Sequence, residues 1–267
     1  MTNSATGGGR EHGTSQVQSV DRAIAILYLL AQRGEAGVTE VAAELGVHKS
    51  TAFRLITALD TGGLIEQDGE RGKYRLGRGI LRLAAATAGG LELPTESRQV
   101  CRRLAAELGE AVNVAILDGA EATNILQEYG TSTITGRNWI GQRTPLHATA
   151  SGKVLLSWMD AVALKEVLAS TLQHYTAETV AEPAELEAEL AAVRDRGWAS
   201  TSEEFEIGLN AVAVPVRDAT GDVVAAVGVS GPSYRLTVES FPAVAARLIT
   251  GSEEISARLG YFGRGGH

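Results

Sequence analysis

The sequence predicts an α+β protein with an N-terminal winged helix-turn-helix, a linker helix and a C-terminal domain of mixed helices and strands. Three observations support this fold class. Two short helical patterns flank Gly46, and a strand–turn–strand pattern follows them over residues 64–77. An apolar helical pattern with few charges comes next, and strands alternate with helices from Leu93 onwards. With 267 residues, the chain is long enough for two domains.

We expect a disordered N-terminal arm over 1–15, a winged helix-turn-helix over 16–78, a linker and dimerisation helix over 79–92, and a second domain over 93–262. The arm is rich in Gly, Ser and Thr and has no apolar core behind a basic start, so it does not resemble a signal peptide. No apolar run approaches the ~20 residues that span a bilayer. Cys101 is the only cysteine and is predicted to be a buried structural thiol. We therefore expect a cytoplasmic protein.

The helix-turn-helix is predicted from periodicity and from one glycine. A first helix is expected from Ser19, with Asp21 near the positive end of its dipole. A short second helix follows, with Thr39 as its N-cap candidate. Gly46 then supplies a residue that enters the left-handed conformation at low cost. The next helix carries the apolar residues Ala52, Phe53, Leu55, Ile56 and Leu59.

Candidate DNA-binding residues gather at the start of that last helix, where a recognition helix meets bases and phosphates. They are His48, Lys49, Ser50, Thr51 and Arg54, with Lys73 and Arg75 on the wing. Between His48 and Arg82, seven basic residues stand against four acidic ones, whereas the whole chain has a net charge of −8. This asymmetry favours a DNA-binding end joined to an acidic sensor over a merely packed small domain.

An apolar helix after the wing, around Ile80 to Ala88, is expected to pair with its own copy in a second subunit. A two-fold dimer would read an inverted repeat on double-stranded DNA. Leu93 and Pro94 are expected to mark the domain boundary, with a helix following to Leu108. The later pattern predicts two hairpins, over 112–129 and 211–229, and helices over 150–159, 183–196 and 238–259.

The chain resembles the IclR family of bacterial transcriptional regulators from about Gln16 to Tyr261. The matching segments are SVDRAIAILYLLA, LGVHKSTAFRLITAL, GKYRLG, PLHATASGKVLLS, EEFEIGLNAVAVPVRD and VGVSGPSYRL. The resemblance implies a dimerising linker helix, a GAF-like C-terminal domain that binds a small metabolite, and no cofactor. It also implies homodimers that often associate into tetramers, and repression more often than activation.

The resemblance also implies an effector pocket next to the helix that follows the HATASGK segment. Carried over by position, its lining is Ala150, Ser151, Thr201, Ala211, Gly228 and Ser230. Amides at a helix N-terminus suit an anion. Thr201, Ala211 and Gly228 depart from the glyoxylate-binding pattern, which suggests a different ligand with more room. Trp139 and Ile140 could close over it, and Arg137 or Arg143 could pair with a carboxylate or be solvated loop charges.

Several segments partly match enzyme or metal-site motifs, but none of them is favoured as such a site. SGK at 151–153 lacks the Walker A pattern, and the GVSGP segment has Pro232 where a nucleophile elbow needs Gly. His147 could be a base or a metal ligand, but a loop-fixing hydrogen bond is favoured because no ligand residue neighbours it. Glu203, Glu204 and Glu206 could hold a cation, but a solvated loop is favoured. No set of catalytic or metal-binding residues is complete.

We therefore predict a non-enzymatic, DNA-binding transcriptional regulator whose operator binding changes with a small metabolite. Repression is preferred on family grounds. An effector-dependent activator of a catabolic operon and a metabolite-processing enzyme with a vestigial DNA-binding domain are the alternatives. The effector could be a small organic acid, a ureide, a sugar-acid derivative or an aromatic acid.

Overall fold

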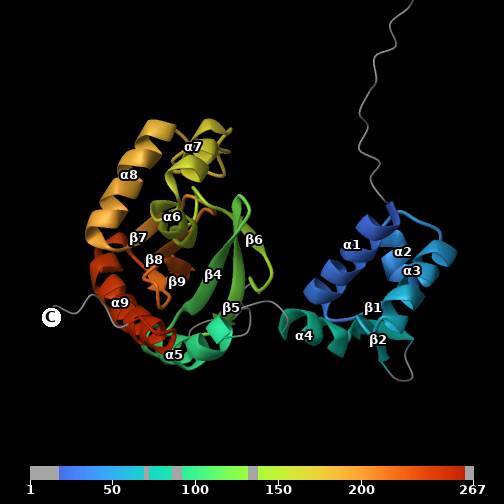
Figure 1. The fold of residues 1–267 in the computed structure, drawn as a ribbon. Coiled ribbons are helices and arrows are strands. Elements are labelled where there is room, and N and C mark those ends of the chain that lie inside the picture. Colours follow the sequence, from blue (N-terminus) through green and yellow to red (C-terminus); the bar gives the residue numbers. More distant parts are fainter. Residues whose placement is uncertain (1–17, 69–71, 86–91, 132–137, 262–267) are drawn as a thin grey trace, which may run out of the picture. The chain divides into compact units, whose positions relative to one another are not determined.

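A computed structural model describes residues 18–68, 72–85, 92–131 and 138–261 (Figure 1). The predicted arm over 1–15 lies outside these residues. The chain divides into two compact units, an N-terminal unit over Met1–Ala88 and a C-terminal unit over Gly89–His267. Each unit is described by itself. In the described part of the chain, no helix is both long and apolar enough to cross a bilayer.

The N-terminal unit is a winged helix-turn-helix, as the sequence predicts. Its strands form an antiparallel sheet in the order β1-β3-β2, and the wing is the β2–β3 hairpin. Its core is built from buried side chains of the first three helices, including Ile26, Leu30, Val41 and Ile56. The elements are α1 (Gln18–Arg33), β1 (Ala36–Gly37), α2 (Val38–Glu44), α3 (Lys49–Thr61), β2 (Ile65–Asp68), β3 (Lys73–Leu76) and α4 (Arg78–Ala85).

The start of α2 differs from the sequence prediction. Gly37, not Thr39, is the N-cap residue, and its amide donates to Glu40 Oε2 at 2.7 Å. Gly37 pairs with Lys73 in the sheet, so the chain is still extended there and turns into a helix at the next residue. The strand β1 was not predicted because two residues are too short to show a pattern. Gly46 has φ +60°, which confirms the predicted left-handed turn.

Phe53 is a second difference, because it belongs to the apolar pattern of α3 but is 54% exposed. The five apolar positions of this helix span a wider arc than the core of so small a unit covers. Ala52, Ile56 and Leu59 are buried, Leu55 is partly buried, and Phe53 faces outwards. An aromatic side chain therefore stands in the open beside the basic residues of α3.

The C-terminal unit is a six-stranded antiparallel sheet with helices on both faces, in the strand order β6-β5-β4-β9-β8-β7. Both predicted hairpins are present, with Gly119 and Gly221 at positive φ in their turns. The strands are β4 (Ala111–Asp118), β5 (Glu121–Glu128), β6 (Arg143–Pro145), β7 (Ala199–Ser202), β8 (Leu209–Arg217) and β9 (Val223–Pro232).

The helices of this unit follow the predictions with three differences. Leu93 and Pro94, expected at a boundary, lie in the first turn of α5, where a proline is tolerated. The last predicted helix begins with a short 3-10 turn over Val238–Ser240, and α7 was not predicted. The strands β6 and β7 were not predicted either. The helices are α5 (Glu92–Leu108), α6 (Ala150–Ser157), α7 (Ala161–Ala169), α8 (Pro183–Arg196) and α9 (Phe241–Arg258).

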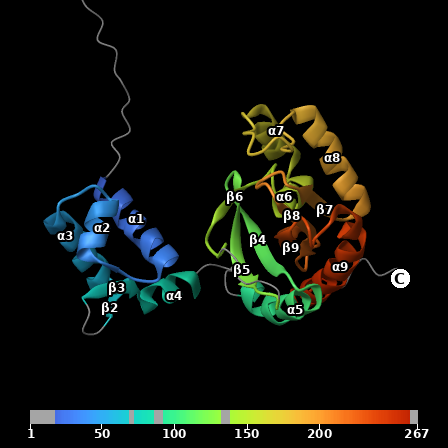
Figure 2. The same ribbon diagram turned by 180° about the vertical axis from the view of Figure 1, so that it is seen from behind.

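The two faces of the sheet differ in side-chain size. Helices α5 and α9, side by side in Figure 2, pack on a face of β4, β8 and β9 made of valines such as Val114, Val214 and Val227. The opposite face carries Ala115, Ala213 and other small residues, and it packs against α6 and α8. Small side chains let α6 approach the sheet closely, and this approach positions the cavity described below.

Cys101 lies in the core between α5 and the sheet and has no exposed surface. Burial raises the pKa of its thiol to about 12, so the thiol is protonated at neutral pH and a poor nucleophile. This confirms the prediction of a buried structural cysteine.

Candidate functional site

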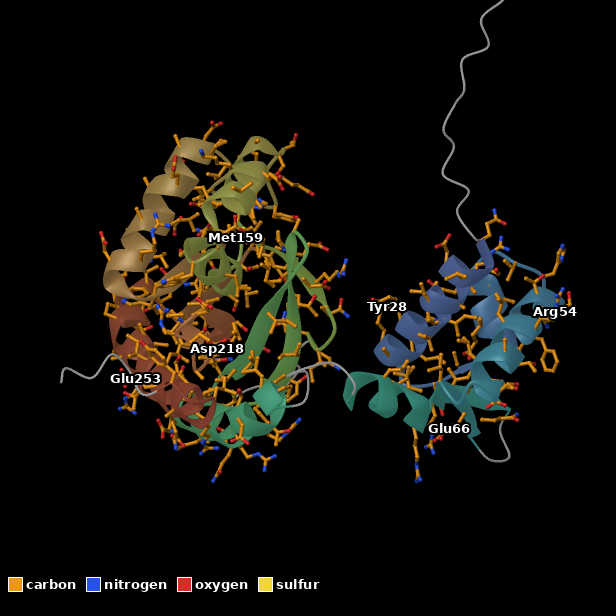
Figure 3. The ribbon with its side chains drawn as sticks, viewed as in Figure 1. Tyr28, Arg54, Glu66, Met159, Asp218 and Glu253 are labelled. Carbon is orange, nitrogen blue, oxygen red and sulfur yellow. The ribbon has the colours of Figure 1, made fainter. Side chains whose placement is uncertain are left out.

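The start of α3 presents the predicted DNA-binding residues together. His48 is the N-cap residue, with an extended backbone and no side-chain hydrogen bond to the helix. Lys49, Ser50 and Arg54 are exposed and Thr51 is partly exposed. Arg54 projects away from the unit (Figure 3). Neither Lys49 nor Arg54 has an ion-pair partner in the described part of the chain, so both charges are available to phosphates or bases.

The two wing residues are placed differently. Lys73 Nζ lies 2.6 Å from Glu35 Oε1, and Arg75 Nε lies 2.9 Å from Glu66 Oε1. Both pairs are substantially exposed, and such pairs contribute only about 0 to 1 kcal/mol to stability. A phosphate can therefore compete with the carboxylates at low cost.

All six predicted effector residues line one cavity of about 70 Å³ in the C-terminal unit. The cavity lies between the small-residue face of the sheet and the start of α6. Sequence reasoning missed several other lining residues, although polar residues within the apolar strands β4 and β5 were a signal that could have found two of them. The missed residues are Asn113, Asn124, Thr144, Thr149, Phe205, Leu209, Val212 and Val229, whereas Trp139 was anticipated.

Two glycines set the distance between α6 and its surroundings. A Cβ on Gly152 would lie 2.3 Å from the carbonyl oxygen of Leu146. A Cβ on Gly228 would lie 2.9 Å from the Val212 carbonyl oxygen and 3.2 Å from Ser151 Oγ. Because Gly228 has no side chain, α6 can approach the sheet at this position. Protein atoms already fill the space that a side chain would occupy.

The start of α6 offers hydrogen-bond donors to the cavity. Thr149 caps the helix: its Oγ1 accepts from the Gly152 amide at 3.2 Å and donates to the Pro145 carbonyl at 2.8 Å. The amides of Ala150 and Ser151 have no acceptor among the described residues. With the positive end of the helix dipole behind them, they can bind an anionic or carbonyl oxygen.

Asn113 offers an acceptor on the opposite wall. Its Nδ2 donates to Ser230 Oγ at 3.4 Å, and its Oδ1 has no hydrogen-bond partner. The residue is only 8% exposed, so the orphaned oxygen costs free energy unless something donates to it. A ligand suited to this cavity therefore combines an acidic or carbonyl oxygen with a hydroxyl or N–H group.

A buried ion cluster forms around Lys153 of α6, and sequence reasoning missed it. Lys153 has no exposed surface, and its Nζ contacts both carboxylate oxygens of Glu204 and Glu189 Oε2, each at 2.7 Å. The prediction of a solvated acidic loop is therefore wrong for Glu204, which is buried. Burial raises the pKa of the Glu204 carboxyl, and the charge of Lys153 opposes that rise.

The remaining candidates have structural partners. His147 Nε2 lies 2.9 Å from the Gln173 carbonyl, as expected of a loop-fixing histidine. Arg143 contacts Asp118 at 2.6 Å and Glu121 at 3.5 Å. Ile140 is exposed, and Arg137 lies outside the described residues. Within the described ranges, no group of His, Cys, Asp and Glu side chains is arranged to hold a metal ion.

Comparison with known proteins covers nearly the whole chain. The family model for the "IclR helix-turn-helix domain" matches residues 19–69, and that for "Bacterial transcriptional regulator IclR C-terminal" matches residues 85–257. The transcriptional repressor AllR of Escherichia coli K12 is 34% identical over 245 residues, which cover 91% of this chain and 90% of AllR.

Two further proteins are also similar to nearly the whole chain. The transcriptional regulator KdgR of Escherichia coli K12 is 32% identical over 92% of this chain and 94% of its own length. The crystal structure of the Thermotoga maritima IclR superimposes with a TM-score of 0.74 at 28% identity, covering 92% of this chain and all of that one.

Proposed function

The chain belongs to the IclR family of bacterial transcriptional regulators, and we propose that it is a repressor that leaves or rearranges on its operator when a small acid binds in the C-terminal unit. The single observation that supports ligand binding is the cavity at the start of α6. It combines two free amides, several hydroxyl groups and the orphaned Asn113 Oδ1. These groups favour a small carboxylate or related catabolite that also carries a hydroxyl or N–H donor.

The DNA-binding surface of this proposal is the start of α3 together with the wing. His48, Lys49, Ser50, Thr51 and Arg54 would face the major groove, while Lys73 and Arg75 would contact phosphates. Two copies related by a two-fold axis would read an inverted repeat, as a homodimer or within a tetramer. A regulator of this kind works in the cytoplasm, where the chromosome is, and needs no catalytic residues.

Replacement of Arg54 by Ala is expected to weaken operator binding by about 1 to 3 kcal/mol if Arg54 reads a base, with a smaller effect on scrambled DNA. A loss that is equal for both DNAs would indicate a phosphate contact instead. The measurement is a titration of the full chain against operator and scrambled duplexes at several salt concentrations.

The matched control is Arg33→Ala, because Arg33 lies at the end of α1 and pairs with Glu44. This variant is expected to bind both duplexes as the wild type does. If Arg54→Ala also leaves both affinities unchanged, Arg54 is not at the interface and the proposed surface is wrong.

A catabolite that binds the cavity is expected to raise the melting temperature of the C-terminal unit. All three tryptophans, Trp139, Trp158 and Trp198, lie in this unit, so their fluorescence reports its unfolding in the full chain. Asn113→Leu is expected to weaken a ligand that donates to Oδ1 about tenfold, without lowering the melting temperature of the free protein.

The same ligand decides between repressor and activator. Coupling between ligand and DNA is reciprocal, so a gel shift with and without the ligand gives its sign. Release of the operator supports repression, and a requirement for the ligand supports activation. If the ligand is consumed on incubation, the protein is an enzyme and the proposal fails.

A further inference from the structure

A second and larger cavity is lined by the end of α6, by α7 and by the β4–β5 turn. Its volume of about 670 Å³ falls within the range of small-molecule sites. Met159, labelled in Figure 3, marks its position at the end of α6. Its walls include the side chains Glu121, His147, Trp158, Met159, Glu166 and Tyr175.

The apolar walls of this cleft are incompletely covered by the protein itself. Helix α7 has no fully buried residue, and its lining residues Ala163 and Val167 are only partly buried. Trp158, Met159 and Val167 are only partly buried against the core below. An apolar ligand body that entered the cleft would remove surface of these side chains from water.

The charged side chains that line the cleft are all acidic. Glu121, Asp160 and Glu166 line it, and no lysine or arginine does so among the described residues. Outside the lining, the guanidinium of Arg217 lies 5.2 Å from the Trp158 ring. The Asp160 carboxylate already accepts the amides of Val162 and Ala163, and Glu121 lies 3.5 Å from Arg143. Glu166 has no ion pair within the described ranges, so its charge is the one available to a ligand.

His147 adds an acceptor rather than a positive charge. Burial lowers the pKa of its ring, which is therefore neutral at pH 7. The Gln173 carbonyl can only accept a hydrogen bond, so Nε2 carries the hydrogen and Nδ1 is left as an acceptor. The polar groups of the cleft thus favour a donor, and Tyr175, which lines the cleft, is an aromatic residue of the kind that attracts cations.

We propose that this cleft is a second ligand site and that it binds an organic cation, a protonated amine carried on an apolar or aromatic body. The carboxylate of Glu166 and the acceptors of Glu121 and His147 face the ammonium group. The apolar walls, Trp158 and Met159 among them, hold the body. The site is distinct from the cavity at the start of α6, whose free amides suit an anion.

A chain of aromatic rings joins the two cavities. Trp139 and Phe205, which line the first cavity, have ring centroids 6.1 Å apart. Phe205 contacts Tyr175 edge-on at 5.2 Å, and Tyr175 lies 5.9 Å from His147. A ligand that moves the Tyr175 ring therefore acts on a wall of the first cavity through direct contacts.

The test is calorimetric titration of the full-length protein with 2-phenylethylamine, and with 2-phenylethanol and phenylacetate as neutral and anionic analogues. The amine is expected to bind with one site per chain and at least about tenfold more tightly than either analogue. Glu166→Gln is expected to weaken the amine about fivefold, whereas Glu187→Gln, an exposed charge on α8, is expected to leave its affinity unchanged.

Asn113→Leu separates this proposal from the one for the first cavity, because it alters the wall of that cavity alone. It is expected to leave amine binding unchanged. Three results would overturn the second site: no saturable binding of the amine, equal affinity for 2-phenylethanol, or loss of amine binding in Asn113→Leu. A change of association state in Glu166→Gln without any amine binding would assign the cleft to contacts between chains and would also overturn it.

Discussion

Replacement of Lys153 by Met is expected to lower the free energy of unfolding of the C-terminal unit by about 3 to 5 kcal/mol. The variant keeps most of the side-chain volume but leaves the buried Glu204 carboxylate without the ammonium that contacts both of its oxygens. Glu189, the second partner, loses its ion pair as well. Urea unfolding of the full chain, followed by tryptophan fluorescence, measures the loss.

Arg103→Met is the matched control, since Arg103 lies in the same unit but pairs with Glu254 at the surface. Its expected cost is below about 1 kcal/mol. The double variant Lys153→Met, Glu204→Gln is expected to recover part of the loss, because it removes the uncompensated charge. A Lys153→Met cost no larger than that of the control would show that the cluster does not hold α6 in place.

The loss in Lys153→Met is also expected to depend on pH. Without Lys153, only the hydrogen bond from the Val180 amide, 3.5 Å long, opposes the effect of burial, which raises the pKa of Glu204 in the folded state. A raised folded pKa gives stability that is present below the unfolded pKa and is lost as the pH rises through the folded value. The deficit should therefore be smaller at about pH 5 than at about pH 8.

Gly152→Ala is expected to destabilise the C-terminal unit by about 3 kcal/mol, at the upper end of overpacking effects. The new Cβ would lie 2.3 Å from a backbone oxygen of Leu146, and backbone cannot swing aside as a flexible side chain can. The direction is informative, because Gly→Ala inside a helix otherwise stabilises by about 0.5 to 1 kcal/mol. The same urea titration measures it.

Gly208→Ala provides the comparison. Gly208 has φ +81° and open space around its Cβ position. The only expected cost of alanine there is that of the left-handed backbone conformation, about 1 to 2 kcal/mol. The Gly152 variant should also lose catabolite binding, since α6 must move and its free amides move with it. Unchanged or increased stability of Gly152→Ala would contradict the close approach of α6 to Leu146.

The N-terminal unit could be predicted from the sequence in most of its details. Helix periodicity, the left-handed Gly46 and the strand–turn–strand of the wing each arise within a few residues. The two differences depend on residues that are distant in the chain. Gly37 caps α2 because it pairs with Lys73, and Phe53 faces outwards because the core covers only part of α3. Neither partner is visible in the local pattern.

The sequence by itself determined the order of the elements, their glycine turns and the basic start of α3, because these depend on backbone preferences and on residues close in the chain. Only the tertiary structure decided that Lys153 meets Glu204, 51 residues away, and that Asn113, with an unpaired oxygen, lines the cavity at the start of α6. A lone Lys, Glu or Asn looks the same in a sequence whether it is solvated or buried. Its partner, and with it the free energy of its charge or hydrogen bond, exists only once the sheet and α6 have come together.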